Sequence, residues 1–150
     1  MAEILRRLKA TFEDLQPALE FTNPLELLIA TILSAQCTDK RVNQVTRQLF
    51  KKYRSAQDYV DTSQETLENE IHSTGFFHNK AVNIRKCTQA LVERHNGAVP
   101  DTMEALTDLA GVGRKTANVV LGNAFGIPGV AVDTHVKRIS GLLGMTKQTD

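Results

Sequence analysis

Residues 101–140, DTMEALTDLAGVGRKTANVVLGNAFGIPGVAVDTHVKRIS, predict two closely joined helices, a loop and the start of a third helix. In the first helix, Asp101 is the expected N-cap and Glu104 completes a capping box. The chain breaks at Gly111-Val112-Gly113, and the next helix begins almost at once. Helices joined this tightly must cross sharply, and the N–H groups of the turn lie where no acceptor within the helix is available. The stretch therefore predicts an anion site suited to a phosphate.

Lys115 is expected to point away from the core that its own helix builds. At about 100° per residue, Ala117, Val120 and Leu121 fall on the side of the helix opposite this lysine. The positive end of a helix dipole also favours the neutral amine that a nucleophile needs. A lysine considered alone, however, is most often simply solvated, and glycine turns between helices are common in ordinary helical hairpins.

Asp133 follows the apolar run Val130–Val132 and opens the next expected helix. Considered alone, this residue is explained at least as well by a helix N-cap role as by a catalytic role, and the two are compatible because capping fixes the direction of the carboxylate. His135 is a weak candidate metal ligand, since no second His or Cys stands at ligand spacing.

The remaining pattern is helical throughout and predicts an all-α protein. An amphipathic helix is expected from Met1 to Leu15, and a helix apolar on every side follows the N-cap Asn23 and should be buried at the centre. Two short helices are expected at 55–60 and 63–73, and a long one from about Asn79 to His95.

Four residues outside the hairpin have competing explanations. Gln36 and Asp39 belong to a polar cluster after the central helix, and helix termination and capping would account for both. Phe76 and Phe77 lie in a turn between polar neighbours. Core packing and an external role are evenly open for Phe76, and core packing is favoured for Phe77.

Composition excludes some classes of protein. The 150 residues carry a formal charge of +1, so any nucleic-acid partner must be inferred from local geometry. Cys37 and Cys87 lack metal-ligand or disulfide spacing and are expected to be small buried hydrophobes in a reducing compartment. The longest apolar run is too short to span a bilayer, so a soluble intracellular protein is expected.

With these residues assembled, the chain resembles the endonuclease III family, bifunctional DNA glycosylases and AP lyases of the helix-hairpin-helix superfamily. The resemblance covers essentially the whole chain. It rests on five ordered blocks: LLIATILSAQCTD (27–39), STGFFHNKA (73–81), HNGAVP (95–100), LAGVGRKTANVVL (109–121) and VAVDTHVKR (130–138).

The resemblance implies a helix-hairpin-helix DNA glycosylase fold, in which a six-helix barrel domain stands beside a second helical domain. Residues 21–132 would form the barrel, with the hairpin at about 101–124. Residues 1–20 would belong to the second, iron–sulfur domain, and 133–150 would begin the return to it. We expect that second domain to be incomplete, and interpret the chain as C-terminally truncated and weakly active or inactive.

The resemblance also implies a chemistry, removal of oxidised pyrimidines from duplex DNA. Lys115 matches the nucleophile that attacks the sugar, expels the base and leaves a Schiff base, after which β-elimination cuts the strand on the 3′ side. Asp133 matches the catalytic carboxylate. The DNA-binding set implied comprises Gln36 and Phe76, which fill or wedge the base stack, together with Asp39, Gly111, Val112, Gly113, Arg114, Thr116 and His135.

Two departures from the family pattern stand out. Ala110 replaces the usual proline before the hairpin turn, and the four-cysteine [4Fe-4S] segment is not in the sequence. No metal or cofactor is therefore expected in this chain, and a cluster is expected only if such a segment follows. Damaged double-stranded DNA is the expected partner of a monomer without membrane attachment, in the cytoplasm and associated with the nucleoid. A non-catalytic duplex-binding module and a monofunctional glycosylase, such as an adenine glycosylase, are the alternatives, and lesion preference stays open.

Overall fold

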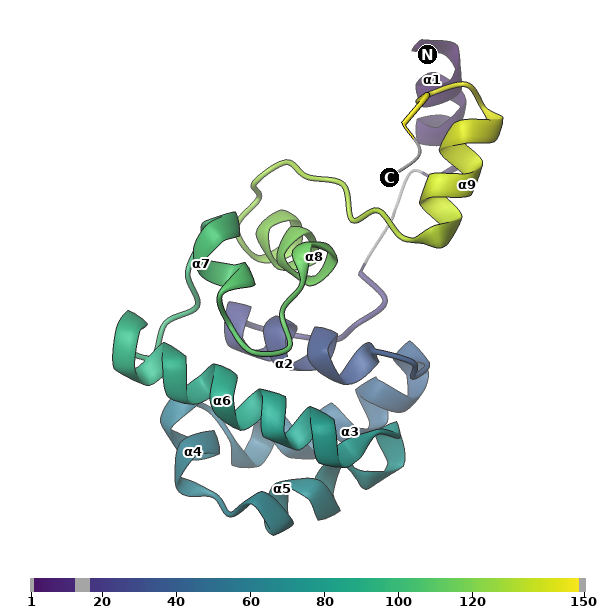
Figure 1. Cartoon of the computed structure of the whole chain (residues 1–150). Helices are drawn as coiled ribbons and strands as arrows, with labels where there is room; N and C mark the ends of the chain where they lie inside the picture. Colours follow the sequence, from purple (N-terminus) through teal and green to yellow (C-terminus); the bar gives the residue numbers. More distant parts are fainter. Residues whose placement is uncertain (1, 13–16, 149–150) are drawn as a thin grey trace. The chain divides into compact units, whose positions relative to one another are not determined.

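The computed structural model describes residues 2–12 and 17–148, and within these residues all regular structure is helical (Figure 1). The all-α prediction is therefore confirmed. Contacts divide the chain into two compact units, one of residues 18–131 and one that joins residues 1–17 to 132–150.

The 18–131 unit contains seven α-helices and one short 3₁₀ helix along its length. In chain order they are α2 (Pro24–Ser34), α3 (Asp39–Lys52), α4 (Ala56–Asp61), α5 (Gln64–Ile71), η1 (His72–Thr74), α6 (Phe77–His95), α7 (Met103–Thr107) and α8 (Arg114–Ala124). This unit therefore holds both helices of the predicted hairpin, α7 and α8.

Helix α2 forms the centre of the 18–131 unit, as its apolar sequence predicts. The Asn23 side chain caps it by accepting the Glu26 N–H at 3.0 Å, and Pro24 occupies its first turn. It packs against α3, α6 and α8, and six of its side chains are buried: Leu27, Leu28, Ile29, Ala30, Ile32 and Leu33. Burying each large apolar side chain contributes about 1.5–3 kcal/mol, so this helix anchors the segments packed around it.

Most of the predicted helix boundaries hold to within two residues, and one cap prediction is wrong. The N-cap of α7 is Thr102, whose hydroxyl accepts the Ala105 N–H at 3.3 Å, and not Asp101. The helix starts at Met103, one residue later than an Asp101 cap requires, and a hydroxyl three residues before an amide is the geometry that a cap needs. Helix α6 begins at Phe77, before the expected Asn79.

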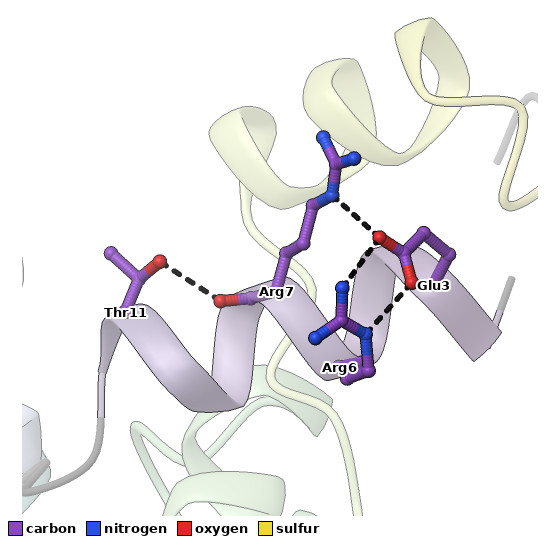
Figure 2. Close-up of polar contacts among 4 residues, drawn as sticks. All are labelled: Glu3, Arg6, Arg7 and Thr11. Carbon is purple, nitrogen blue, oxygen red and sulfur yellow. Dashed lines mark hydrogen bonds and ion pairs between the residues drawn. The ribbon is translucent and has the colours of Figure 1, made fainter.

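The other unit contains α1 (Ala2–Thr11) and α9 (Thr134–Leu142). Along α1, Glu3 accepts hydrogen bonds from Arg6 and Arg7, and the Thr11 hydroxyl donates to the Arg7 carbonyl (Figure 2). These exposed ion pairs contribute little stability. Leu15, which completes the predicted helical stripe, lies outside the described residues, as does Met1.

Neither helix of this unit has a buried residue, and Leu5, Leu8 and Leu142 are all exposed. A search of the described residues also found no helix with the length and apolar character needed to cross a membrane.

Candidate active site

The turn between α7 and α8 is held by backbone hydrogen bonds and by one buried side chain. The Leu109 N–H donates to the Leu106 carbonyl, and the Val112 N–H donates to the Leu109 carbonyl, each at 3.1 Å. Val112 is only 6% exposed and packs into the core, which fixes the middle of the turn. Gly111 has φ +77°, in the left-handed region where side chains are rarely tolerated. The predicted tight turn is present, and its shape depends on Gly111.

The backbone at the start of α8 faces open space. Gly113 is the N-cap, with an extended φ of −90°, and its carbonyl accepts the Ala117 N–H at 2.9 Å. A β-carbon added to Gly113 would meet no atom within 4 Å. The N–H groups of a helix's first turn have no acceptors inside the helix and lie at the positive end of its dipole. The space beside Gly113 is therefore open, as an anion site at this helix start requires.

Lys115 lies on the exposed side of that same first turn, next to exposed Arg114. On the opposite side of α8, Ala117, Val120 and Leu121 are buried in the core. The predicted direction of the lysine therefore holds, and its side chain stands on the surface that carries the open backbone of Gly113.

Gln36 and Phe76, predicted to fill or wedge the base stack, share an uncommon backbone conformation. Both have left-handed dihedrals, with φ +51° for Gln36 and φ +49° for Phe76. Left-handed backbone is uncommon for residues other than glycine, costs about 1–2 kcal/mol, and clusters at functional sites. Each residue lies in a short loop next to a helix terminus, Gln36 after α2 and Phe76 before α6.

The side chain of Phe76 is 64% exposed, so the core explanation for it is wrong. Phe77 is half-buried against the core, as favoured, and its ring is tilted against those of His72 and His78. The difference follows from Gly75 and Phe76, whose successive positive φ angles turn the Phe76 side chain out just before α6 begins.

Asp39 is exposed and is the first residue of α3. The cap of that helix is Thr38, whose side chain accepts the Arg41 N–H at 3.3 Å, so Asp39 itself is not the cap. A carboxylate in the first turn still complements the helix dipole. The DNA-binding role of Asp39 stays a prediction.

Asp133 and His135 lie in the other unit, at the start of α9. The Asp133 Oδ1 accepts the Val136 N–H at 2.8 Å, which confirms the N-cap role. The cap orients the carboxylate relative to its own helix, and His135 is exposed beside it. Its catalytic pairing with Lys115 stays a prediction, as does DNA contact by His135.

Sequence reasoning missed Lys80, which is buried at 5% exposure near the start of α6. Its Nζ donates to the Thr74 carbonyl at 2.8 Å, and its backbone N–H donates to the Phe76 carbonyl at 3.1 Å. Burial lowers the pKa of its ammonium group. The burial of Lys80 could have been found from the helical spacing, because Lys80 stands four residues before Ile84 on the face that α6 buries.

The two cysteines of the chain do not fit a four-cysteine iron–sulfur cluster. Such a cluster takes four thiolate ligands. Cys87 is fully buried in the core, where burial raises its thiol pKa to about 12, and Cys37 is half-buried at the end of α2. Cys87 is buried, as the sequence predicts, whereas Cys37 is only half-buried against the core, and two cysteines are fewer than the four ligands of such a cluster.

Comparison with known proteins places this geometry in a family. The HhH-GPD superfamily of base excision DNA repair proteins matches residues 29–150. The endonuclease III of Synechocystis sp. is 54% identical over 149 residues, which cover 99% of this chain and 68% of that protein.

Two solved structures are similar across almost the whole chain. A non-covalent endonuclease III–DNA complex is 49% identical with a TM-score of 0.93, covering 99% of this chain and 70% of the other. A trapped endonuclease III–DNA covalent intermediate, an estranged-adenine complex, is 50% identical with a TM-score of 0.91, covering 97% and 68%. This chain thus spans about two thirds of the length of these relatives. Its hairpin, its helices and its sequence agree in one assignment: the chain belongs to the endonuclease III family of HhH-GPD base excision DNA repair proteins.

Proposed function

We propose that the protein is a base excision repair DNA glycosylase with AP lyase activity, acting on oxidised pyrimidines in damaged duplex DNA. The observation that carries the proposal is the exposed Lys115 on the first turn of α8, directly after the open backbone of Gly113. A similar protein was captured as a covalent intermediate with DNA, which supports an amine nucleophile in this chain as well.

The hairpin would bind a phosphate of the DNA backbone through the N–H groups at the start of α8. Such contacts position a duplex without reading its sequence. Extruding a base from the stack costs a few kcal/mol, and the exposed ring of Phe76 and the side chain of Gln36 would enter the space that the base leaves.

Lys115 would then act as the nucleophile. Its neutral Nζ donates a lone pair to C1′ of the sugar, the glycosidic bond breaks with its electrons going to the base, and the proton that Nζ loses neutralises the base. The nitrogen lone pair then forms the C1′=N bond as the C1′–O4′ bond breaks, and O4′ takes up a proton from water, which leaves a protonated Schiff base. Removal of a proton from C2′ expels the 3′ phosphate by β-elimination, and water releases the lysine.

Asp133 would supply the carboxylate of the reaction. A carboxylate stabilises positive charge that develops on the sugar and takes part in proton transfer to or from an amine. Its Oδ1 accepts the Val136 N–H at 2.8 Å, and this cap fixes the direction of the carboxylate relative to α9.

The test is borohydride trapping on a duplex with one thymine glycol. We expect a covalent protein–DNA product with the unsubstituted protein, none with Lys115→Ala, and an undiminished product with the control Lys86→Ala, which removes an exposed lysine of α6. Trapping that survives Lys115→Ala would refute the assignment. Salt-sensitive binding without base release would identify a non-catalytic binding module, and base release without trapping a monofunctional glycosylase.

The wider assignments belong to the same proposal. The protein would act as a monomer in the cytoplasm, associated with the nucleoid through its DNA substrate. An iron–sulfur cluster would need cysteine ligands beyond the two in this chain.

A further inference from the structure

Lys80 is a charged side chain in a place where lysines are rarely found. Lysine is almost never fully buried unless it is paired, and this one is 5% exposed on a face of α6 that otherwise packs into the core. The proposed reaction assigns it no role. Its burial therefore has to be explained by what its ammonium group contacts.

The contacts of Lys80 surround the turn that presents Phe76. Its Nζ donates to the carbonyl of Thr74, two residues before Phe76, at 2.8 Å. Its backbone N–H donates to the carbonyl of Phe76 itself at 3.1 Å. Between these two bonds lie Gly75 and Phe76, with successive positive φ angles of +70° and +49°. The ammonium group thus holds one side of this turn, and the first backbone hydrogen bond of α6 holds the other.

Lys80 also interacts with the loop that carries Gln36. It interacts electrostatically with the thiol of Cys37, the residue that follows Gln36 in the chain. The Cys37 N–H donates to the Ser34 carbonyl at 3.0 Å, which closes that loop at the end of α2. The ammonium group of Lys80 therefore hydrogen-bonds into the Phe76 turn and interacts electrostatically with the residue after Gln36.

We propose that Lys80 is a positioning residue, whose ammonium group holds the Phe76 turn, beside the Gln36 loop, in the conformation that enters the base stack. The inference rests on the proposed function, because it concerns the step of base extrusion. Without the ammonium group, the Thr74 carbonyl loses its donor, and the Phe76 backbone is released to relax from its left-handed conformation.

The test compares two activities that differ in their need for a wedge. Excision of thymine glycol from a duplex requires a base to be extruded and the gap filled. Cleavage at an abasic site in a single strand requires only the lysine chemistry, since there is no partner strand and no stack to fill. Both rates are divided by the fraction of protein that borohydride traps on the abasic single strand, which needs no wedge, so that partial unfolding does not enter the comparison.

We expect Lys80→Met, similar in size but without the ammonium group, to lower duplex excision by about tenfold, or roughly 1.4 kcal/mol. Single-strand cleavage should change by less than about twofold. The matched control is Lys86→Met, which removes an exposed lysine from the same helix and should leave both rates unchanged. A Lys80→Met variant with an unaltered duplex rate would overturn the inference.

A double-variant cycle separates positioning from general stability. If Lys80 acts through Phe76, Lys80→Met should cause no further loss in a Phe76→Ala background, whereas independent effects would multiply. Multiplied losses would overturn the inference. The cycle is repeated with Lys80→Gln, whose side chain is too short for the Thr74 carbonyl and stays polar if methionine prevents folding. A parent protein that neither excises nor is trapped would instead refute the proposed function.

Discussion

The side chain of Asn83 occupies the space that a β-carbon on Gly111 would need. A β-carbon built at Gly111 would lie 2.9 Å from the Cβ of Asn83 and 3.2 Å from its Cγ. Helix α6 therefore presses against the hairpin turn at the point where the backbone has a positive φ. The same helix begins directly after Phe76, so α6 both contacts the hairpin turn and follows the loop that carries Phe76.

Substitution by alanine should lower stability much more at Gly111 than at Gly113. Gly111→Ala should lower the free energy of unfolding by about 2 kcal/mol or more, because it adds left-handed strain and a contact with Asn83. Gly113→Ala should change stability by less than about 1 kcal/mol, since its extended backbone suits alanine and the added methyl meets no atom. Urea unfolding measures both.

Gly113→Ala, which should barely change stability, should nevertheless weaken the affinity for duplex DNA. Its methyl would stand where a phosphate has to approach, and the loss of one hydrogen bond to a charged group costs about 1.5–3 kcal/mol, so binding should weaken at least about tenfold. Filter binding or fluorescence anisotropy at fixed salt measures this. Unchanged affinity in a folded Gly113→Ala protein would contradict phosphate binding at this turn.

Asp133→Asn should separate capping from catalysis. Asparagine caps helices about as well as aspartate, so α9 should keep its stability to within about 0.5 kcal/mol. The carboxylate is lost, and we expect excision of thymine glycol to fall by about 100-fold or more. Asp133→Ala should lose both the excision activity and the helix cap, and the loss of the cap should lower stability by about 1 kcal/mol. An Asp133→Asn protein with full activity would leave this residue with its capping role alone.

Phe76→Gly should lower duplex excision while it removes the backbone strain at this position. Glycine adopts φ +49° without penalty, and the lost side chain is mostly exposed, so thermal stability should be unchanged or slightly higher. Duplex excision should fall by at least about tenfold, because no ring remains to enter the stack. The control is Asn96→Gly, at φ +52° at the far end of α6, which should keep full activity. Equal activity in both variants would argue against a wedge.

The Cys87 thiol should make stability fall at alkaline pH. Burial raises its pKa in the folded protein to about 12, from an ordinary value of 9.0, so the folded chain keeps a proton that the unfolded chain loses. This contribution is fully present below pH 9 and is lost as the pH rises towards 12, by about 1.4 kcal/mol per pH unit. Urea unfolding at pH 8 and pH 10 should show a larger drop for the parent than for Cys87→Ala. Equal drops would contradict the burial of this thiol.

Local signals were sufficient for much of the fold. The apolar composition of α2 predicts its burial, the Asn23, Thr38 and Ser55 side chains cap the helices that follow them, and Gly111 marks the hairpin turn. These features depend on neighbours within about four residues, where helical periodicity and capping act. The misplaced Asp101 cap shows the limit, because Asp101 and Thr102 are both capping residue types and the helix uses Thr102.

The sequence itself contains the reactive residue types and their spacing. For this reason the hairpin, the exposed Lys115 and the capping Asp133 can be predicted from it. Three other features cannot be predicted from the sequence: the exposure of the Phe76 ring, the burial of Lys80 beside the Phe76 turn, and the contact of Asn83 with Gly111. Each depends on groups far apart in sequence or on backbone strain that is held only by packing against α6. Local propensity disfavours a left-handed phenylalanine and a buried lysine, and only the assembled core makes either conformation stable.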